Sequence, residues 1–313
     1  MKTILLTTSS FGKYDKTPLE RLETSGFLIV PNPFGRKLSE EEVFSLIQTH
    51  KPVGIIAGVE PLTEKVLQEA PGLKLISRCG IGLDSVDLSA AERLGIRVTN
   101  TPDAPTIPVA ELTVGMILSL LRKIHYSDAG IRAGGWQRPM GNLISGKTVG
   151  IIGCGRIGSY VIRLLSSFGC NLLGYDVYPH SDPRQYLPSE LPDLLDNSDI
   201  VSLHIPYSTE NHHFIDRDKI QMMKKGAFLI NTARGGLVDE DAVQFALASG
   251  HLGGAALDSF EQEPYSGPLI ESDGMLLTGH IGSYAIEGRV IMENEAVDNL
   301  FSELKKAGIR MQE

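Results

Sequence analysis

One glycine-rich turn constrains the fold of this chain more than any other feature of its sequence. The segment Gly153-Cys154-Gly155-Arg156-Ile157-Gly158 follows an apolar run at 148–152 and precedes an apolar helical pattern at 159–168. In such a turn the first glycine permits a tight bend, the second the approach of a pyrophosphate, and the third close packing of the helix on the strand. The N–H groups at the start of the helix then attract the phosphates. The segment therefore predicts a dinucleotide-binding unit built on a parallel sheet.

The residue after the next predicted strand indicates which dinucleotide is bound. That strand covers 171–175, and Asp176 follows it, eighteen residues after Gly158. A carboxylate here accepts hydrogen bonds from the ribose hydroxyls and repels a 2′-phosphate. Val177 and Tyr178 come next, and the nearest cation is Arg184. We therefore expect NAD rather than NADP; the alternative is a glycine-rich turn beside a surface aspartate that binds no cofactor.

Short apolar runs alternate with helical patterns along the chain, which favours parallel sheets with helices on both faces. The capping box of Ser39 and Glu42 predicts a helix at 39–49. Longer helices are expected at 107–124 and 284–307. The predicted strands lie at 3–7, 26–30, 53–57, 73–77 and 97–99 in a first series, and at 148–152, 171–175, 200–203, 227–231, 254–257 and 275–278 in a second.

The 313 residues are enough for two domains, and the two series of strands predict where they lie. The last helix has no strand to follow, so we expect it to return to the first domain. The predicted fold class is α/β, with two Rossmann/flavodoxin-like, doubly wound parallel-sheet domains and a ligand cleft between them. The expected boundaries are 1–100 plus 284–313 for a substrate domain and 101–283 for an NAD-binding Rossmann domain.

Composition excludes several classes of protein. Apolar residues make up 42% of the chain, which is typical of a globular protein and not of a disordered one. The formal charge is 29 − 38 = −9, and no long basic run is present, which argues against nucleic acid and anionic membranes as partners. A few local arginines still allow an anionic substrate.

The cysteines and the N-terminus predict a cytoplasmic protein. The three cysteines, Cys79, Cys154 and Cys170, are too far apart for a disulfide framework or a metal-binding Cys-x-x-Cys pattern. The start of the chain, 1–6, reads as a first strand rather than a signal peptide. No apolar stretch reaches the length of a membrane span.

Three chemically useful residues follow strands of the second series. Arg234 comes after the strand at 227–231, Glu263 lies past the strand at 254–257, and His280 follows the strand at 275–278. Because the carboxyl ends of parallel strands face the ligand crevice, we expect these three side chains to converge near the cofactor.

The three residue types suit the reduction of a 2-keto acid. Arginine binds a carboxylate bidentately, histidine donates a proton near neutral pH, and a glutamate orients the imidazole and favours its charged form. Each residue alone is weak evidence, since an arginine or histidine at such a place is often a surface or turn residue.

The remaining histidines lack this context and are interpreted as structural or surface residues: His50, His125, His180, His204, His212, His213 and His251. The pair His212-His213 could suggest a metal, but no third ligand lies at useful spacing nearby. No metal site is predicted.

The ordered set of motifs resembles the D-isomer-specific 2-hydroxyacid dehydrogenase family, over essentially the whole chain. Within that family the chain is most similar to phosphoglycerate-dehydrogenase-like members. The motifs that carry the resemblance are Gly153–Gly158, Asp176, Asn231-Thr232-Ala233-Arg234-Gly235, Asp258 to Pro264, and His280-Ile281-Gly282.

The resemblance implies a role for each matching residue. Arg234 would anchor the substrate carboxylate, and His280 would be the acid/base, with Glu263 as its partner. Arg156 and Ile157 would give N–H groups to the pyrophosphate. The residues implied to line the cofactor groove are Pro206, Thr232 and Ala233, with Asp258 on the nicotinamide side. The implied substrate loop is Arg78, Cys79, Gly80 and Ile81, whose N–H groups would form an anion nest.

The resemblance also implies an NAD-dependent enzyme that forms a homodimer through the NAD domain. Its substrate would be a small 2-hydroxy or 2-keto acid, with D-3-phosphoglycerate, hydroxypyruvate and glyoxylate as candidates. The turn at 57–59 lacks the cation that phosphoglycerate dehydrogenases usually carry, and we expect no C-terminal regulatory domain, since the sequence stops at Glu313. Gly279 stands where proline is more usual, which predicts a looser loop. Glu263 argues against formate, where glutamine is usual, and phosphite stays open.

Two further alternatives stay open. The chain could be a non-enzymatic, NAD(H)-sensing corepressor-like protein on the same fold. Cys79 could be a redox-sensitive thiol, or a small residue that fits a tight loop.

Overall fold

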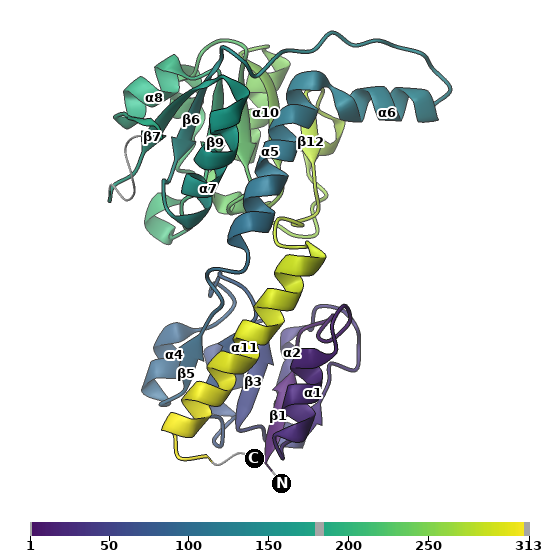
Figure 1. Ribbon diagram of the computed structural model, residues 1–313, viewed down its shortest axis with the longest axis vertical. Helices are drawn as coiled ribbons and strands as arrows, with labels where there is room; N and C mark the ends of the chain where they lie inside the picture. The colour runs from purple at the N-terminus through teal and green to yellow at the C-terminus, as the bar shows by residue number, and fades with distance from the viewer. Residues whose placement is uncertain (1, 179–184, 310–313) are drawn as a thin grey trace. The chain divides into compact units, whose positions relative to one another are not determined.

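The computed structural model describes residues 2–178 and 185–309. The chain forms two compact units, which we call unit 1 (Met1–Pro105 and Ser283–Glu313) and unit 2 (Thr106–Gly282). Each contains one parallel sheet with helices on both faces (Figure 1). The predicted fold class, two doubly wound α/β units, is confirmed.

The sheet of unit 1 has five parallel strands in the order β2-β1-β3-β4-β5. This is the flavodoxin-like order, in which the chain reverses direction between β1 and β3. The strands are β1 (Thr3–Leu6), β2 (Leu28–Val30), β3 (Gly54–Ala57), β4 (Leu75–Arg78) and β5 (Arg97–Thr99).

Alternate strand residues of unit 1 enter two separate cores. Ile4 packs in the core that also contains residues of α1 and α11, whereas its neighbour Leu5 packs in the core with α2, α3 and α4. The capping box of Ser39 and Glu42 is confirmed at the start of α2. The helices are α1 (Thr17–Thr24), α2 (Glu40–His50), α3 (Glu64–Gln68), α4 (Leu88–Arg93) and α11 (Ile286–Lys306).

The sheet of unit 2 has seven parallel strands in the order β12-β11-β10-β9-β6-β7-β8. β6 pairs with β7 on one side and β9 on the other, so the direction of winding changes at its carboxyl end. Open α/β sheets bind ligands at this switch point. The strands are β6 (Thr148–Ile152), β7 (Asn171–Tyr175), β8 (Leu187–Pro188), β9 (Ile200–Leu203), β10 (Ala227–Asn231), β11 (Leu252–Leu257) and β12 (Met275–Leu277).

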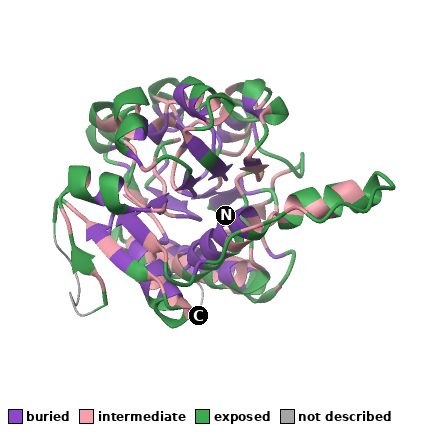
Figure 2. Cartoon of the chain, turned by 90° about the horizontal axis from the view of Figure 1, so that it is seen from above, coloured by how far each residue is buried: buried purple, intermediate pink, exposed green. Residues whose placement is uncertain are grey.

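Helices cover both faces of this second sheet. One apolar core contains residues of α5 and α7, and the other contains residues of α8, α9 and α10. In Figure 2 the strands are mostly buried, and exposed residues gather on the outer helices and loops. The helices are α5 (Thr106–Arg122), α6 (Ile124–Arg132), α7 (Arg156–Leu165), α8 (Leu191–Asn197), α9 (Arg217–Met222) and α10 (Glu240–Ala248).

Helix α6 differs from the other long helices of unit 2. It has no buried residue, and it projects away from the rest of the unit in Figure 1. Of the helices that the structure describes, none is both long and apolar enough to cross a membrane.

Candidate active site

The glycine-rich turn joins β6 to α7, and its three glycines have different surroundings. Gly153 has a φ of +92°, and a Cβ there would lie 2.6 Å from the carbonyl oxygen of His204. A Cβ on Gly158 would overlap the carbonyl oxygen of Gly153, so this glycine lets α7 pack against β6. A Cβ on Gly155 would meet nothing within 4 Å. Open space at the second glycine is what the approach of a pyrophosphate requires.

The N-terminus of α7 offers donors to an anion. The helix begins at Arg156, Gly155 is its N-cap, and no side chain caps it. The first N–H groups of a helix, here those of Arg156, Ile157 and Gly158, have no acceptor within the helix. The helix dipole adds partial positive charge at the same place. Arg156 also borders a hollow beside α7, together with Tyr186.

Asp176 lies directly beside this turn. One carboxylate oxygen accepts a hydrogen bond from the Cys154 N–H at 2.7 Å, and the other accepts one from the Tyr178 N–H at 2.9 Å. These bonds fix the carboxylate at the end of β7, where a ribose is expected. Val177 and Tyr178 are exposed and carry no charge. Arg184 and His180 lie outside the described residues.

The turn after β10 is held by a buried amide that the sequence analysis quoted only as part of a motif. Asn231, which is fully buried, donates from Nδ2 to the Arg234 carbonyl at 2.7 Å and accepts from the Ala233 N–H at 3.0 Å. The Thr232 hydroxyl lies 2.8 Å from that of Thr113 on α5. This network fixes the backbone of the half-buried Arg234.

Two of the predicted site segments pass very close to each other. A Cβ on Gly235 would overlap the backbone of Phe260, so only glycine permits this approach. The turn that carries Arg234 therefore lies against the segment 258–264, which carries Glu263. Pro206 lies in the segment after β9, the neighbouring strand of the same sheet.

His280 and Glu263, predicted as a pair, are in contact. The Nδ1 atom of His280 lies 2.9 Å and 3.0 Å from the two carboxylate oxygens of Glu263. Because an ionised carboxylate only accepts hydrogen bonds, Nδ1 carries the proton, and Nε2 stays available for proton transfer. The Phe260 N–H donates to the same carboxylate at 3.1 Å. The two side chains are 43% and 36% exposed, so a small molecule has access to them.

Asp258 holds the loop that carries His280. One of its carboxylate oxygens accepts from the Thr278 hydroxyl at 2.6 Å and the Ile281 N–H at 2.8 Å, and the other accepts from the Gly282 N–H at 2.8 Å. The His280 N–H donates to the Asp258 carbonyl at 2.7 Å. His280 has a φ of +55°, which is uncommon for a residue with a side chain. The loop is therefore tightly bonded, in contrast to the looser loop expected from Gly279.

The predicted substrate loop lies in unit 1 and begins at Arg78, the last residue of β4. The N–H groups of Cys79 and Gly80 are already bonded, to the Ala57 carbonyl at 2.9 Å and the Thr101 hydroxyl at 2.8 Å. These two groups therefore do not form the expected anion nest. The guanidinium of Arg78 folds back over Gly80 and donates to the Cys79 carbonyl. The Ile81 carbonyl accepts from the Asn100 side chain at 2.8 Å.

Two buried groups lie near this loop. Burial raises the pKa of the Cys79 thiol to about 11, so the group is a thiol and not a thiolate at neutral pH. Burial also raises the pKa of Glu60, which accepts hydrogen bonds from Thr7 and from the Gly58 N–H. Cys79 thus fits the interpretation of a small residue in a tight loop better than that of a redox-sensitive thiol.

The structure also brings Glu261 to the His212-His213 pair, in a cluster that the spacing in the sequence did not reveal. The partner lies 48 residues along the chain, on the segment after β11.

A comparison with known families identifies the chain. Residues 114–282 match the profile of the D-isomer specific 2-hydroxyacid dehydrogenase, NAD binding domain. This chain belongs to the D-isomer-specific 2-hydroxyacid dehydrogenase family. It is accordingly an NAD-dependent dehydrogenase, and the matched residues cover nearly all of unit 2, including the glycine-rich turn, Arg234, Glu263 and His280.

Several members of the family are similar to this one. A glyoxylate reductase of Thermofilum pendens is 42% identical over 258 residues, covering 79% of this chain and 76% of that protein. A D-3-phosphoglycerate dehydrogenase of Methanocaldococcus jannaschii is 39% identical over 259 residues, covering 80% of this chain but only 49% of that protein. The apo structure of D-lactate dehydrogenase from Escherichia coli has a TM-score of 0.82 at 31% identity, with 98% of each chain covered.

Proposed function

We propose that this dehydrogenase reduces a short 2-keto acid with NADH to the D-2-hydroxy acid, with glyoxylate and hydroxypyruvate as the best candidates. The contact between His280 and Glu263, in the unit that matches the NAD-binding profile, carries the proposal. In this reaction the reduced nicotinamide supplies a hydride to C2 of the keto acid. The protein must then supply an anchor for the carboxylate and a proton for the carbonyl oxygen.

Arg234 is the proposed anchor, because its guanidinium matches a carboxylate in shape and charge. His280 is the proposed acid: Nε2 gives its proton to the carbonyl oxygen as C2 accepts the hydride. Glu263 stabilises the imidazolium before transfer and keeps Nδ1 protonated afterwards. The sum is one keto acid, one NADH and one proton giving one hydroxy acid and one NAD⁺, and the reverse direction uses the same groups. Residues 78–81 of unit 1, Arg78, Cys79, Gly80 and Ile81, are proposed to contribute to substrate binding.

The same proposal assigns the cofactor residues. Gly153, Gly155 and Gly158, with the N–H groups of Arg156 and Ile157, would hold the pyrophosphate, and Asp176 would accept from the ribose. Asp258 is proposed to serve two purposes. Among the described residues, its Oδ2 atom accepts one hydrogen bond, from the Gly282 N–H, so this oxygen keeps a lone pair for the nicotinamide amide. The residues proposed to line the groove are Pro206, Thr232 and Ala233.

A short substrate is favoured over phosphoglycerate by the turn after β3. Residues 54–64 contain no lysine or arginine, and the Gly58 N–H already donates to the buried carboxyl of Glu60. A phosphate would find no cation from this turn.

We also propose a homodimer formed through unit 2, in the cytoplasm. Helix α6 buries no residue, and the segment after it exposes large apolar side chains. An apolar surface of this extent usually marks an interface. The exposed apolar residues are Ile124, Ile131, Trp136, Met140 and Leu143.

One assay separates this proposal from the alternative, a corepressor-like NAD(H) sensor. Steady NADH consumption would be measured with hydroxypyruvate, glyoxylate, pyruvate, 2-ketoglutarate and phosphohydroxypyruvate. We expect turnover, with the highest kcat/KM for hydroxypyruvate or glyoxylate. NADH binding without turnover on any of the five acids would favour the sensor, and a clear preference for phosphohydroxypyruvate would contradict the proposed substrate.

A further inference from the structure

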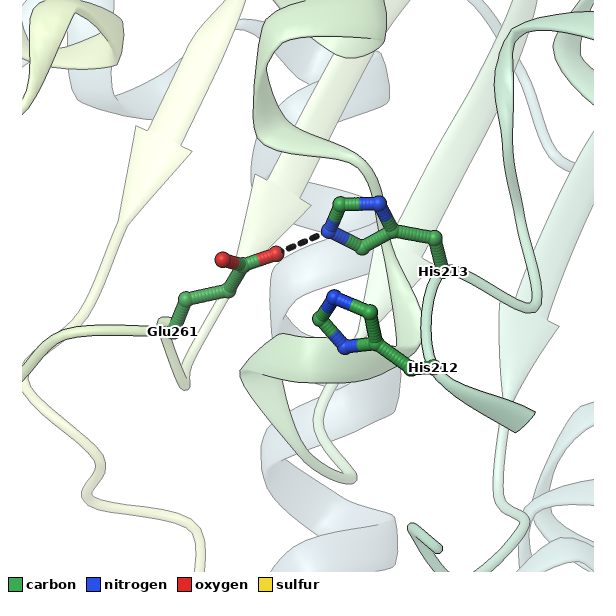
Figure 3. A group of neighbouring side chains, drawn as sticks. All are labelled: His212, His213 and Glu261. Atoms are coloured by element: carbon green, nitrogen blue, oxygen red, sulfur yellow. Dashed lines mark hydrogen bonds and ion pairs between the residues drawn. The ribbon is translucent and has the colours of Figure 1, made fainter. Parts of the chain in front are cut away.

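Two adjacent histidines and a glutamate form a compact cluster on unit 2, outside the residues assigned above. His212 and His213 follow the short 3-10 helix Thr209–Asn211 in the segment after β9, and Glu261 lies in the segment after β11. One ring nitrogen of each histidine and one carboxylate oxygen all lie within 4.8 Å of one another. Figure 3 shows the two rings and the carboxylate directed toward one another.

The three side chains are held in place before any ligand arrives. Nε2 of His213 pairs with the Glu261 carboxylate, and the two imidazole rings stack with centroids 3.9 Å apart at an angle of 25°. The His213 N–H donates to the Gly236 carbonyl at 2.7 Å, and the Glu261 N–H donates to Glu240 at 2.9 Å. A preorganised set of donors loses little freedom when it binds a ligand.

A neighbouring hydroxyl orients the second imidazole. The Tyr207 hydroxyl lies 3.3 Å from Nδ1 of His212. When Nδ1 donates its proton there, Nε2 keeps a lone pair for a ligand. Metal-binding histidines are commonly oriented through their other ring nitrogen in this way.

The surroundings of the cluster are acidic. The Glu240 carboxylate accepts a hydrogen bond from the Glu261 N–H at 2.9 Å. A second carboxyl group therefore lies beside the one that pairs with His213. A cation beside Glu261 would reduce the repulsion among these carboxylates.

We propose that His212, His213 and Glu261 form a binding site for a first-row transition-metal dication of the Zn²⁺ class. Two imidazole nitrogens and one carboxylate oxygen are a donor set that Zn²⁺ prefers, with water in the remaining position. The ion would take the place of the proton between Nε2 of His213 and Glu261, so binding releases a proton and weakens as pH falls. It would also join the segment after β9 to the segment after β11. This inference does not rest on the proposed reaction.

Zinc binding by the full chain tests the proposal. Protein freed of metal with a chelator would be titrated with ZnCl₂ against a chromophoric competitor at pH 7.5 and pH 5.5. We expect one ion per chain, tighter binding at the higher pH, and affinity at least about tenfold weaker in His212→Ala, His213→Ala and Glu261→Gln. Tyr207→Phe should weaken binding by about tenfold, the lower end of what the loss of an orienting group costs.

His50→Ala, which removes the histidine at the end of α2 in unit 1, is the matched control and should bind as the wild type does. Thermal unfolding in chelator checks that each variant is folded. X-ray absorption of the zinc-loaded wild type gives a measurement that needs no variant, and it should show imidazole and oxygen ligands. No binding by the wild type, equal binding by all variants, or thiolate ligands would overturn the proposal, and the cluster would then be an ion pair only.

Discussion

His280 uses its two ring nitrogens differently. Nδ1 contacts Glu263, which leaves Nε2 for the proton transfer that we propose. Replacing His280 by asparagine should lower kcat by about 10²–10⁴-fold, the usual contribution of a general acid, and leave the Kd for NADH nearly unchanged.

Glu263→Gln should act through the imidazole and not through the substrate. Loss of the negative charge removes the group that orients the imidazole and stabilises its charged form, so kcat for keto acid reduction should fall while the Kd for NADH stays near that of the wild type. A pH profile of kcat, with NADH binding followed by fluorescence, checks both variants. Wild-type kcat in His280→Asn would exclude this residue as the acid.

The environment of Cys79 predicts how its thiol reacts. With a pKa of about 11 the fraction of thiolate at pH 8 is about 10⁻³, and the side chain is buried as well. Native protein treated with a thiol reagent at pH 8 should therefore leave Cys79 unmodified, while unfolded protein reacts at all three cysteines. Rapid modification of Cys79 in the native state, located by peptide mapping, would contradict the conclusion that this thiol is buried and protonated.

At the scale of elements, the turn between β6 and α7 offers a pair of matched substitutions. Gly158→Ala forces a Cβ against the Gly153 carbonyl and should destabilise the protein by about 1–3 kcal/mol, as overpacking does. Gly155→Ala has free space and should lower stability by no more than about 1 kcal/mol, the cost of a poorer N-cap. It should nevertheless weaken NADH binding, because the added methyl group would stand where we propose that the pyrophosphate approaches. Denaturant unfolding and NADH titration of both variants check these expectations. A larger loss of stability in Gly155→Ala than in Gly158→Ala, with NADH binding unchanged in Gly155→Ala, would contradict the roles given to the two glycines.

Most elements could be predicted from the sequence because buried parallel strands are continuous apolar runs bounded by turn residues. Every predicted strand is confirmed, with ends that move by up to two residues. The sequence did not predict β8 (Leu187–Pro188) at the edge of the sheet, because a strand of two residues is too short to show an apolar pattern. The contact between His280 and Glu263 could also be anticipated, since parallel strands bring their carboxyl ends to one edge.

Most other hydrogen bonds between residues distant in sequence could not be predicted. Nothing in the sequence shows that Thr101 occupies the Gly80 N–H, or that the Asp258 carboxylate binds three donors of the loop after β12. The approach of Glu261 to His213 belongs to the same class, because it depends on how two loops meet. Such contacts follow from tertiary packing and not from local spacing.

At the scale of the whole molecule, the exposed apolar surface of unit 2 predicts self-association. Trp136 and Met140 are 81% and 86% exposed, which is unusual for large apolar side chains. The double variant Trp136→Asp, Met140→Asp should shift the protein from dimer to monomer in sedimentation velocity. Leu187→Asp, which changes an exposed apolar residue at the far edge of the same sheet, is the control and should stay dimeric. A wild-type protein that sediments as a monomer would contradict the proposed dimer.

The most direct test of the central claim is the catalytic efficiency of Arg234→Ala on the best keto acid. Losing the proposed charged contact to the substrate carboxylate should lower kcat/KM by about 10²-fold or more, corresponding to about 3 kcal/mol, while the Kd for NADH stays near that of the wild type. If Arg234→Ala instead retained wild-type kcat/KM, the proposed site would be wrong, however well the variant bound the cofactor.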